Sequence, residues 1–175
     1  MKLQNSQKLR VAIIGASGYG GIQLLRILKD HPKFEVSFLG GEKSAGKKWN
    51  KLFPFLPLKE DLEIRVPDHV EIAKSSDFAL LSLPNGLSSK LTPKLIDSNI
   101  KIVDLSADYR FKSLDMWKEI YIDSASIYKR DDSELCLEAI YGIPEFNFRE
   151  IQNARLVASP GCFPTASLLA MIPFL

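Results

Sequence analysis

The sequence predicts an α/β fold with a doubly wound, mainly parallel sheet and helices on both faces. Three observations support this prediction. Short apolar segments typical of buried strands alternate with segments of helical periodicity. A glycine-rich turn joins the first strand to the first helix. The 175-residue chain is 46% hydrophobic, which suits a globular protein with a sizeable core.

Each strand is expected where a short apolar or β-branched run is bounded by turn residues. Predicted strands cover residues 9–14, 34–39, 63–66, 78–83, 101–105 and 156–159. Predicted helices cover residues 22–28, 69–74, 87–98 and 165–169. Prolines within residues 50–61 argue against regular structure there, and Pro93 predicts a kink or a fresh start in its helix. Residues 106–140 show a mixed pattern.

The first strand and helix enclose a turn that is typical of dinucleotide binding. The turn comprises Gly15, Ala16, Ser17, Gly18, Tyr19, Gly20 and Gly21. Gly15 permits a tight turn, Gly18 allows the backbone to approach a pyrophosphate, and Gly20 or Gly21 allows the helix to pack closely on the strand. The phosphates would lie at the helix N-terminus. This pattern predicts a Rossmann-like fold. A glycine-rich turn without a ligand is the alternative.

The segment after the second strand bears on the choice of cofactor. NAD-binding folds usually place an acidic residue there, to bind the ribose 2′-hydroxyl. Here Glu42 is available, but Lys43, Ser44 and Lys47 follow it. Two cations and a hydroxyl suit a 2′-phosphate better, so the segment favours NADP(H). The alternative is that the lysines are ordinary solvated charges.

Cys162 is the predicted nucleophile. Pro160 and Gly161 precede it and force a turn, and Pro164 suits the first turn of a helix. A sulfur at or just before a helix N-terminus meets unpaired N–H groups and the positive end of the dipole, which stabilise a thiolate. The alternative is a small apolar residue capping a buried helix. The second cysteine, Cys136, lies between two leucines and is interpreted as a packing residue.

On these segments the chain resembles N-acetyl-γ-glutamyl-phosphate reductase, an arginine-pathway relative of aspartate-semialdehyde dehydrogenase. The matching stretches occur in family order and are residues 15–19, 43–47, 83–86, 103–110, 141–145 and 160–165. Three positions depart from the family pattern. Asn85 replaces a usual histidine, Ser159 replaces a usual asparagine, and Gly20 replaces a usual threonine.

The resemblance implies an activity and roles for individual residues. It implies NADPH-dependent reduction of N-acetyl-glutamyl 5-phosphate to the 5-semialdehyde and phosphate, through a thioacyl intermediate on Cys162. It places Asn85 and Gly86 along the cofactor near the nicotinamide, although Asn85 could instead cap a helix. Arg110 becomes the candidate for binding the substrate phosphate, with an ion pair to Asp108 or Asp104 as the alternative. Glu145 is a weaker substrate-binding candidate that could equally cap a turn.

Two rival functions stay open. The same framework could reduce a related acyl phosphate, either aspartyl phosphate or a carrier-linked aminoadipyl phosphate. Phe163-Pro164-Thr165 favours the arginine-type branch over the aspartyl one. From another class, the chain could be a non-catalytic NADP-binding sensor, although a sensor has no need of the Pro-Gly-Cys turn.

Composition and charge exclude several classes. A net charge of +2 argues against a nucleic-acid-binding surface. No stretch is long enough to span a membrane, and residues 1–8 lack the apolar core of a signal peptide. Two cysteines suggest a reducing, cytoplasmic compartment. His31 and His69 have no nearby ligand partner, so we expect no metal site.

The apolar run at residues 166–175 suggests that the chain is the N-terminal part of a longer protein. We therefore expect residues 1–158 to form the NADP-binding domain and residues 159–175 to begin a catalytic domain. The resemblance implies a catalytic histidine downstream of Cys162, and no histidine follows it in this sequence. The 175-residue chain alone is expected to be inactive, and the full-length protein is expected to be a homo-oligomer.

Overall fold

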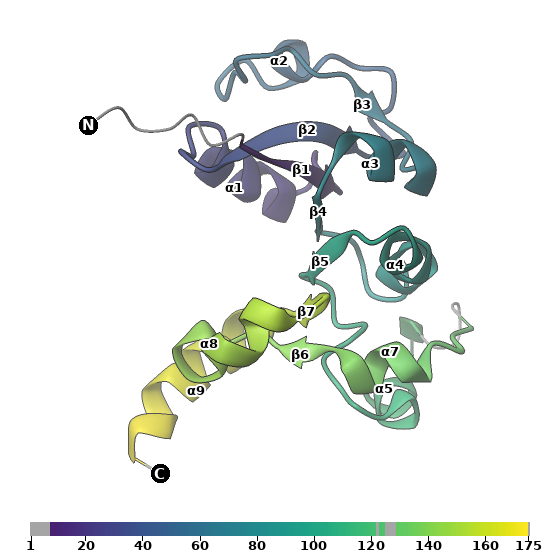
Figure 1. Cartoon of the computed structure of the whole chain (residues 1–175), viewed down its shortest axis with the longest axis vertical. Helices are drawn as coiled ribbons and strands as arrows, with labels where there is room; N and C mark the ends of the chain where they lie inside the picture. The colour runs from purple at the N-terminus through teal and green to yellow at the C-terminus, as the bar shows by residue number, and fades with distance from the viewer. Residues whose placement is uncertain (1–7, 122, 125–128, 175) are drawn as a thin grey trace. The chain divides into compact units, whose positions relative to one another are not determined.

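The computed structural model describes residues 8–121, 123–124 and 129–174. These residues form two compact units (Figure 1). The first unit comprises Met1–Ser82 and Ser98–Ile100, and the second comprises Leu83–Asp97 and Lys101–Leu175.

The first unit is a parallel sheet with helices packed against it. Its strands are β1 (Leu9–Ile14), β2 (Phe34–Gly40), β3 (Ile64–Arg65) and β4 (Phe78–Leu81). Its helices are α1 (Tyr19–Leu28), α2 (Trp49–Leu52) and α3 (His69–Ser75). The strand order is β3-β2-β1-β4, and each of these pairings is parallel. The carboxyl ends of the strands, and the turns that follow them, therefore share one edge of the sheet.

The central strand β1 is covered on both faces, as its apolar sequence predicts. Val11 and Ile13 belong to a buried cluster that includes Leu25 of α1. Ile14 points to the opposite face, where its side chain and that of Pro67, just ahead of α3, both lie over Gly40. Helices α1 and α3 both contact β1 and β2, so the unit is wound on both sides of its sheet (Figure 1).

The second unit repeats this plan with three parallel strands. They are β5 (Lys101–Asp104), β6 (Ile140–Tyr141) and β7 (Leu156–Ala158), in the order β5-β7-β6. Its described helices are α4 (Ser88–Asp97), α5 (Leu114–Ile120), α7 (Ser133–Glu138), α8 (Pro144–Asn153), α9 (Cys162–Met171) and the 3-10 turn η1 (Ile172–Phe174). The N–H of Ser159 donates to the carbonyl of Asp104, so the carboxyl ends of β5 and β7 lie side by side.

The structure confirms the predicted α/β class and each predicted strand, with ends that differ by at most two residues. The sequence did not predict β6. The final helix begins at Cys162 itself rather than at residue 165. Helix α4 continues through Pro93 instead of restarting there. One helical turn, α2, overlaps the start of residues 50–61, which were predicted to be irregular. The sequence did not predict α8.

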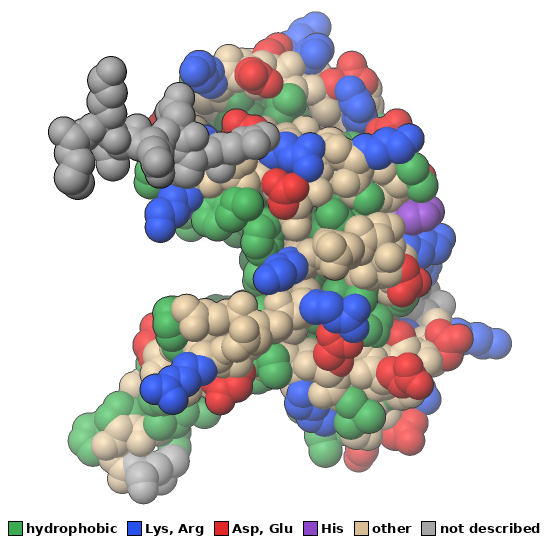
Figure 2. Space-filling model, viewed as in Figure 1, with side chains coloured by type: hydrophobic (Ala, Val, Ile, Leu, Met, Phe, Trp, Pro, Cys, Tyr) green, Lys and Arg blue, Asp and Glu red, His purple; other side chains and the backbone are tan. Residues whose placement is uncertain are grey.

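Helix α9 presents an apolar surface. None of its residues is buried, and Phe163 is 83% exposed. Phe174, in η1 after it, is 89% exposed. Figure 2 shows hydrophobic side chains gathered at this end of the chain. In the part of the chain that the structure describes, no helix is long and apolar enough to cross a membrane.

A substitution at Gly21 tests how closely α1 packs on the glycine turn that precedes it. A Cβ atom at Gly21 would lie 2.3 Å from the carbonyl oxygen of Gly15 and 2.5 Å from that of Ala16, and neither backbone atom can move away cheaply. We expect Gly21→Ala to lower the free energy of unfolding by about 2–3 kcal/mol in urea denaturation.

Gly46→Ala is the comparison. Gly46 has a φ of +79° and nothing within 4 Å of its Cβ position, so only backbone strain of about 1 kcal/mol is expected. Equal losses of stability in the two variants would contradict the packing argument.

Candidate active site

The glycine turn is tied to the end of the neighbouring strand. The N–H groups of Gly15 and Ala16 both donate to the carbonyl of Gly40, at 2.9 and 3.0 Å. Gly15 adopts a φ of +84°, a conformation that favours glycine. The N–H of Gly18 then donates back to the carbonyl of Gly15 at 3.0 Å. These bonds fix the path of the chain into α1.

The first turn of α1 suits an anionic group. Gly18 occupies the N-cap position and supplies no side-chain cap, and no acidic residue lies in the first turn. A Cβ atom at Gly18 would come within 3.3 Å of the Gly15 carbonyl oxygen, so glycine keeps the backbone open at this point. A helix N-terminus without a cap or an acid can accept the pyrophosphate of a dinucleotide.

The loop after β2 approaches the glycine turn. The Ser44 hydroxyl donates to the Ser17 hydroxyl at 2.9 Å, which joins two segments that the sequence assigned to the cofactor. Gly46 closes the loop with a positive φ, and its N–H donates to the carbonyl of Ile64 at 2.8 Å. Lys43 and Lys47 are exposed and make no ion pair with the described residues, so both ammonium groups can meet an anion.

In the second unit, Cys162 is exposed and is the first residue of α9. Gly161 precedes it with a φ of +92° and provides no side-chain cap, and the first turn of α9 carries no acidic residue. Thr165 closes the turn by donating its N–H and its hydroxyl to the Gly161 carbonyl, at 3.1 and 2.7 Å. The sulfur therefore lies at an uncapped helix start, as the sequence predicts.

Arg110 holds the turn that carries Cys162. Its Nε donates to the carbonyl of Ser159 at 2.8 Å, and its Nη2 donates to the carbonyl of Leu105 at 3.0 Å. The guanidinium also lies against Gly161, where a Cβ atom would be 3.0 Å from Nη1. Among the described residues no ion pair joins Arg110 to Asp104 or Asp108, the alternative that the sequence left open.

The Asn85–Gly86 turn is bound to the segment that follows β5. The Asn85 side-chain oxygen accepts the N–H of Ala107 at 3.0 Å. The carboxylate of Asp108 accepts the N–H groups of Gly86 and Ser89, at 2.6 and 2.9 Å. Asp108 rather than Asn85 therefore caps the start of α4.

Asp104, at the end of β5, is a buried carboxyl group. It accepts the hydroxyl of Ser88 at 2.8 Å, and the N–H and hydroxyl of Ser106 at 3.0 and 2.7 Å. Burial raises its pKa to about 6, because loss of hydration outweighs these hydrogen bonds, and the nearby Asp108 adds to the shift.

The remaining residues singled out by the sequence lie as follows. Glu145 is exposed in the first turn of α8, behind Pro144, where its charge complements the helix dipole. Cys136 is fully buried, which confirms its interpretation as a packing residue. No group of three or more metal-ligating side chains occurs among the residues that the structure describes.

The sequence did not indicate that Asp108 and Ser106 belong to the hydrogen-bonded group of polar residues after β5. Both are buried polar residues, and the N–H of Asp108 donates to the Ser106 hydroxyl at 3.1 Å. A signal was present, because a Ser and two Asp residues follow one another closely at the end of a buried strand, where apolar residues are expected.

With this geometry established, comparisons identify the family. The family model "Semialdehyde dehydrogenase, NAD binding domain" matches residues 10–154, so the chain belongs to that family. N-acetyl-gamma-glutamyl-phosphate reductase of Prochlorococcus marinus (strain MIT 9211) is 61% identical over 175 residues, which are 100% of this chain and 49% of that protein. The same-named protein of Parasynechococcus marenigrum (strain WH8102) is 54% identical over 95% of this chain and 46% of its own length. The chain thus spans about half the length of the curated relatives it matches.

Solved structures agree on the fold. Aspartate semialdehyde dehydrogenase II of Vibrio cholerae, complexed with ASA, has a TM-score of 0.65 and 24% identity, covering 96% of this chain and 46% of that chain. Aspartate semialdehyde dehydrogenase of Candida albicans with NADP has a TM-score of 0.58 and 17% identity, covering 83% of this chain and 36% of that chain.

The raised pKa of Asp104 predicts a pH-dependent stability. In the unfolded chain the carboxyl group loses its proton near pH 4, whereas in the fold it keeps the proton to about pH 6. The stabilising contribution is therefore fully present below pH 4 and is lost as the pH rises through 6. Between pH 4 and pH 7, the free energy of unfolding should fall by on the order of 2 kcal/mol relative to that of Asp104→Asn.

Urea denaturation of both proteins at several pH values measures this difference. The variant loses hydrogen bonds at every pH, so the informative quantity is the change in the difference with pH. Parallel pH profiles would show that Asp104 is ionised throughout this range in the folded protein.

Proposed function

We propose that the chain is the cofactor-binding part of an NADPH-dependent reductase that converts N-acetyl-glutamyl 5-phosphate to N-acetyl-glutamate 5-semialdehyde and phosphate. The observation that carries the proposal is the exposed Cys162 at the uncapped start of α9, on a turn held by Arg110. The names of the curated relatives supply the substrate. The reaction belongs to arginine biosynthesis, which fits a cytoplasmic, homo-oligomeric enzyme.

The proposed reaction begins at the sulfur of Cys162. The thiolate attacks the acyl carbon, the bond from that carbon to the phosphate oxygen breaks, and phosphate leaves with the electron pair. A thioester on Cys162 results. A nicotinamide cofactor, when bound, would supply the hydride that reduces the thioester carbon. The carbon–sulfur bond then breaks, which releases the aldehyde and regenerates the thiolate, and one proton is consumed overall.

In this scheme Cys162 reacts from the first position of α9. The first turn of that helix carries no acidic residue, and Gly161 supplies no side-chain cap. The tetrahedral stages also need a general acid and base. The sequence contains two histidines, His31 and His69. His31 accepts N–H groups of its own loop and His69 opens α3, so we assign proton transfer to neither.

Substrate binding is proposed for Arg110 and Glu145. Nε and Nη2 of Arg110 donate to main-chain carbonyls, and Nη1 lies 3.0 Å from the Cβ position of Gly161. This nitrogen would contact the phosphate of the substrate. Exposed Glu145 would help to orient the substrate.

The cofactor is proposed to be NADP(H) rather than NAD(H). The pyrophosphate would lie on the glycine turn from Gly15 to Gly21. Lys43 and Lys47 are exposed and make no ion pair with the described residues, and Ser44 donates to Ser17 of that turn. The lysines and Ser44 would bind the 2′-phosphate, and Asn85 and Gly86 would lie near the nicotinamide.

Cys162→Ser should abolish turnover and leave NADPH binding unchanged, because a hydroxyl is nearly isosteric but far less nucleophilic at neutral pH. The measurement is NADPH oxidation with N-acetyl-glutamyl 5-phosphate, in a protein of the full length of the curated relatives. Cys136→Ser is the control and should keep its activity, with reduced stability. Substantial turnover in Cys162→Ser would remove the cysteine from the mechanism.

Combining Lys43→Ala with Lys47→Ala should weaken NADPH binding at least tenfold and leave NADH binding nearly unchanged. Each charge-assisted contact with a phosphate contributes about 1.5–3 kcal/mol. Fluorescence titration with both cofactors measures the difference. If affinity for the two falls equally, the lysines do not distinguish the 2′-phosphate, and Glu42 becomes the ribose-binding candidate.

A further inference from the structure

The segment from Asp104 to Arg110 contacts two turns that the proposed function uses. Near its middle, the Asp108 carboxylate binds the N–H groups of Gly86 and Ser89, and the N–H of Ala107 binds Asn85. Two hydrogen bonds thus hold the Asn85–Gly86 turn to this segment, and a third holds Ser89 in the first turn of α4.

At its end, the same segment holds the nucleophile. Arg110 donates to the carbonyl of Ser159, three residues before Cys162, and its guanidinium lies against Gly161. Asp108 and Arg110 are separated by one residue, so the two turns are held by neighbouring side chains of one stretch of backbone.

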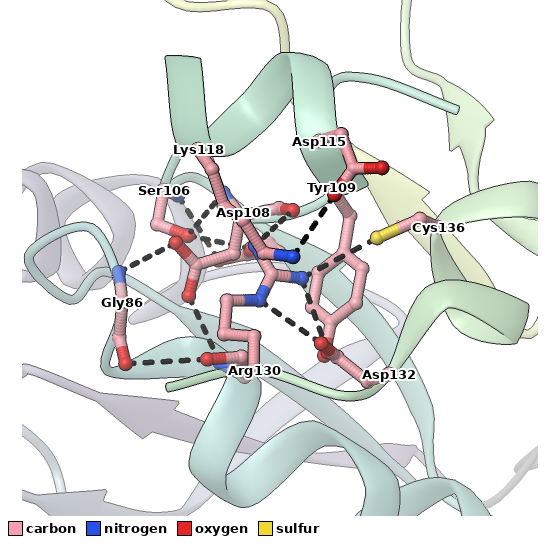
Figure 3. A network of polar contacts seen from close by, with 11 residues as sticks. Gly86, Ser106, Asp108, Tyr109, Asp115, Lys118, Arg130, Asp132 and Cys136 are labelled. Atoms are coloured by element: carbon pink, nitrogen blue, oxygen red, sulfur yellow. Dashed lines mark hydrogen bonds and ion pairs between the residues drawn. The ribbon is translucent and has the colours of Figure 1, made fainter. Parts of the chain in front are cut away.

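A buried network of Arg130, Asp132 and Tyr109 also holds the backbone of this segment (Figure 3). Arg130 donates through Nη1 to the main-chain carbonyl of Asp108 at 2.6 Å, and through Nε and Nη2 to Asp132 at 3.0 and 3.1 Å. The hydroxyl of Tyr109 donates to Asp132 at 2.6 Å, and the Arg130 guanidinium lies 5.1 Å from the centre of the Tyr109 ring. The side chains of Arg130 and Asp132 are 1% and 6% exposed. The backbone at residues 108 and 109 therefore has little freedom to move.

From these contacts we propose that Asp108 is a positioning residue, which fixes the Asn85–Gly86 turn relative to Cys162. The inference rests on the proposed function, in which Cys162 forms the thioester and the Asn85–Gly86 turn lies beside the nicotinamide. Asp108 binds the turn through the N–H of Gly86, and it contacts neither the sulfur of Cys162 nor, in this proposal, the nicotinamide. The Asp108 carboxylate fixes the position of the Asn85–Gly86 turn during hydride transfer.

The effect of Asp108 should therefore differ between the two halves of the reaction. Phosphate release depends on Cys162 and on Arg110, whose bonds to Ser159 and Leu105 do not involve the Asp108 side chain. Hydride transfer depends on the Asn85–Gly86 turn. In Asp108→Asn, an NH₂ group would face one of two N–H donors, so at least one of the bonds to Gly86 and Ser89 is lost.

The test compares Asp108→Asn with wild type in a protein of the full length of the curated relatives. Phosphate release in a single turnover without NADPH should stay within about twofold of wild type, because the Cys162 turn keeps its anchor. The kcat of NADPH oxidation should fall about 10- to 100-fold, as expected when a reacting group is displaced by about 1 Å. The KM for the acyl phosphate should not change.

Asp68→Asn is the matched control. Asp68 caps α3 in the first unit by accepting the N–H groups of Val70 and Glu71 at 3.0 and 2.9 Å, which is the same chemistry outside the proposed site. It should leave both steps unchanged. The inference that Asp108 is a positioning residue is overturned if NADPH oxidation by Asp108→Asn falls no further than its phosphate release. A wild-type protein that shows neither step overturns the proposed function instead.

Ser106→Ala covers the case in which Asp108→Asn does not fold. It removes the hydroxyl that accepts the N–H of Asp108 and donates to Asp104, and it leaves the carboxylate of Asp108 intact. The same contrast should appear at smaller magnitude, with NADPH oxidation slowed more than phosphate release. Equal slowing of the two steps in this variant also overturns the inference.

Discussion

The Asp108 carboxylate is fully buried and binds N–H groups at the start of α4. A buried charge is costly unless donors surround it, and here main-chain donors and the positive end of a helix compensate it. The segment on either side cannot shift without leaving that charge unpaired. Arg110, two residues further on, binds the carbonyl of Ser159 and so holds the Cys162 turn to the same stretch of backbone. The hydride transfer proposed at the thioester thus depends on a carboxylate that does not touch the sulfur.

Much of the fold could be predicted because its signals are local. In β1, four consecutive buried residues follow one another, as expected for a strand covered on both faces, and the glycine turn follows directly. Helix α8 shows the limit of this approach. The backbone of Asn147 is not helical (φ −115°, ψ 28°), so this helix consists of two short pieces, and neither is long enough for a clear helical periodicity. Pro144 and Glu145 at its start are the one signal that could have indicated it.

The site could be predicted where the chemistry lies in one short segment, as in the turn before Cys162. It could not be predicted where a partner is distant in sequence. Asp108 caps a helix start 19 to 22 residues earlier in the chain, whereas cap rules search the residues just before a helix. Arg110 was interpreted from its charge, as a partner for phosphate or for a nearby Asp. Its main contacts are carbonyls instead, because parallel strand ends bring residues 105 and 159 beside it.

The same contacts explain why two departures from the family pattern are compatible with the site. Arg110 binds the main-chain carbonyl of Ser159, which any residue supplies, so the identity of that side chain does not affect the anchor. Asn85 offers a side-chain oxygen to the N–H of Ala107, and an acceptor nitrogen of histidine could fill that role as well. Neither exchange disturbs Asp108, which bears on the Asn85–Gly86 turn through main-chain N–H groups. A site held together by main-chain donors and acceptors tolerates side-chain changes at its edge while keeping its geometry.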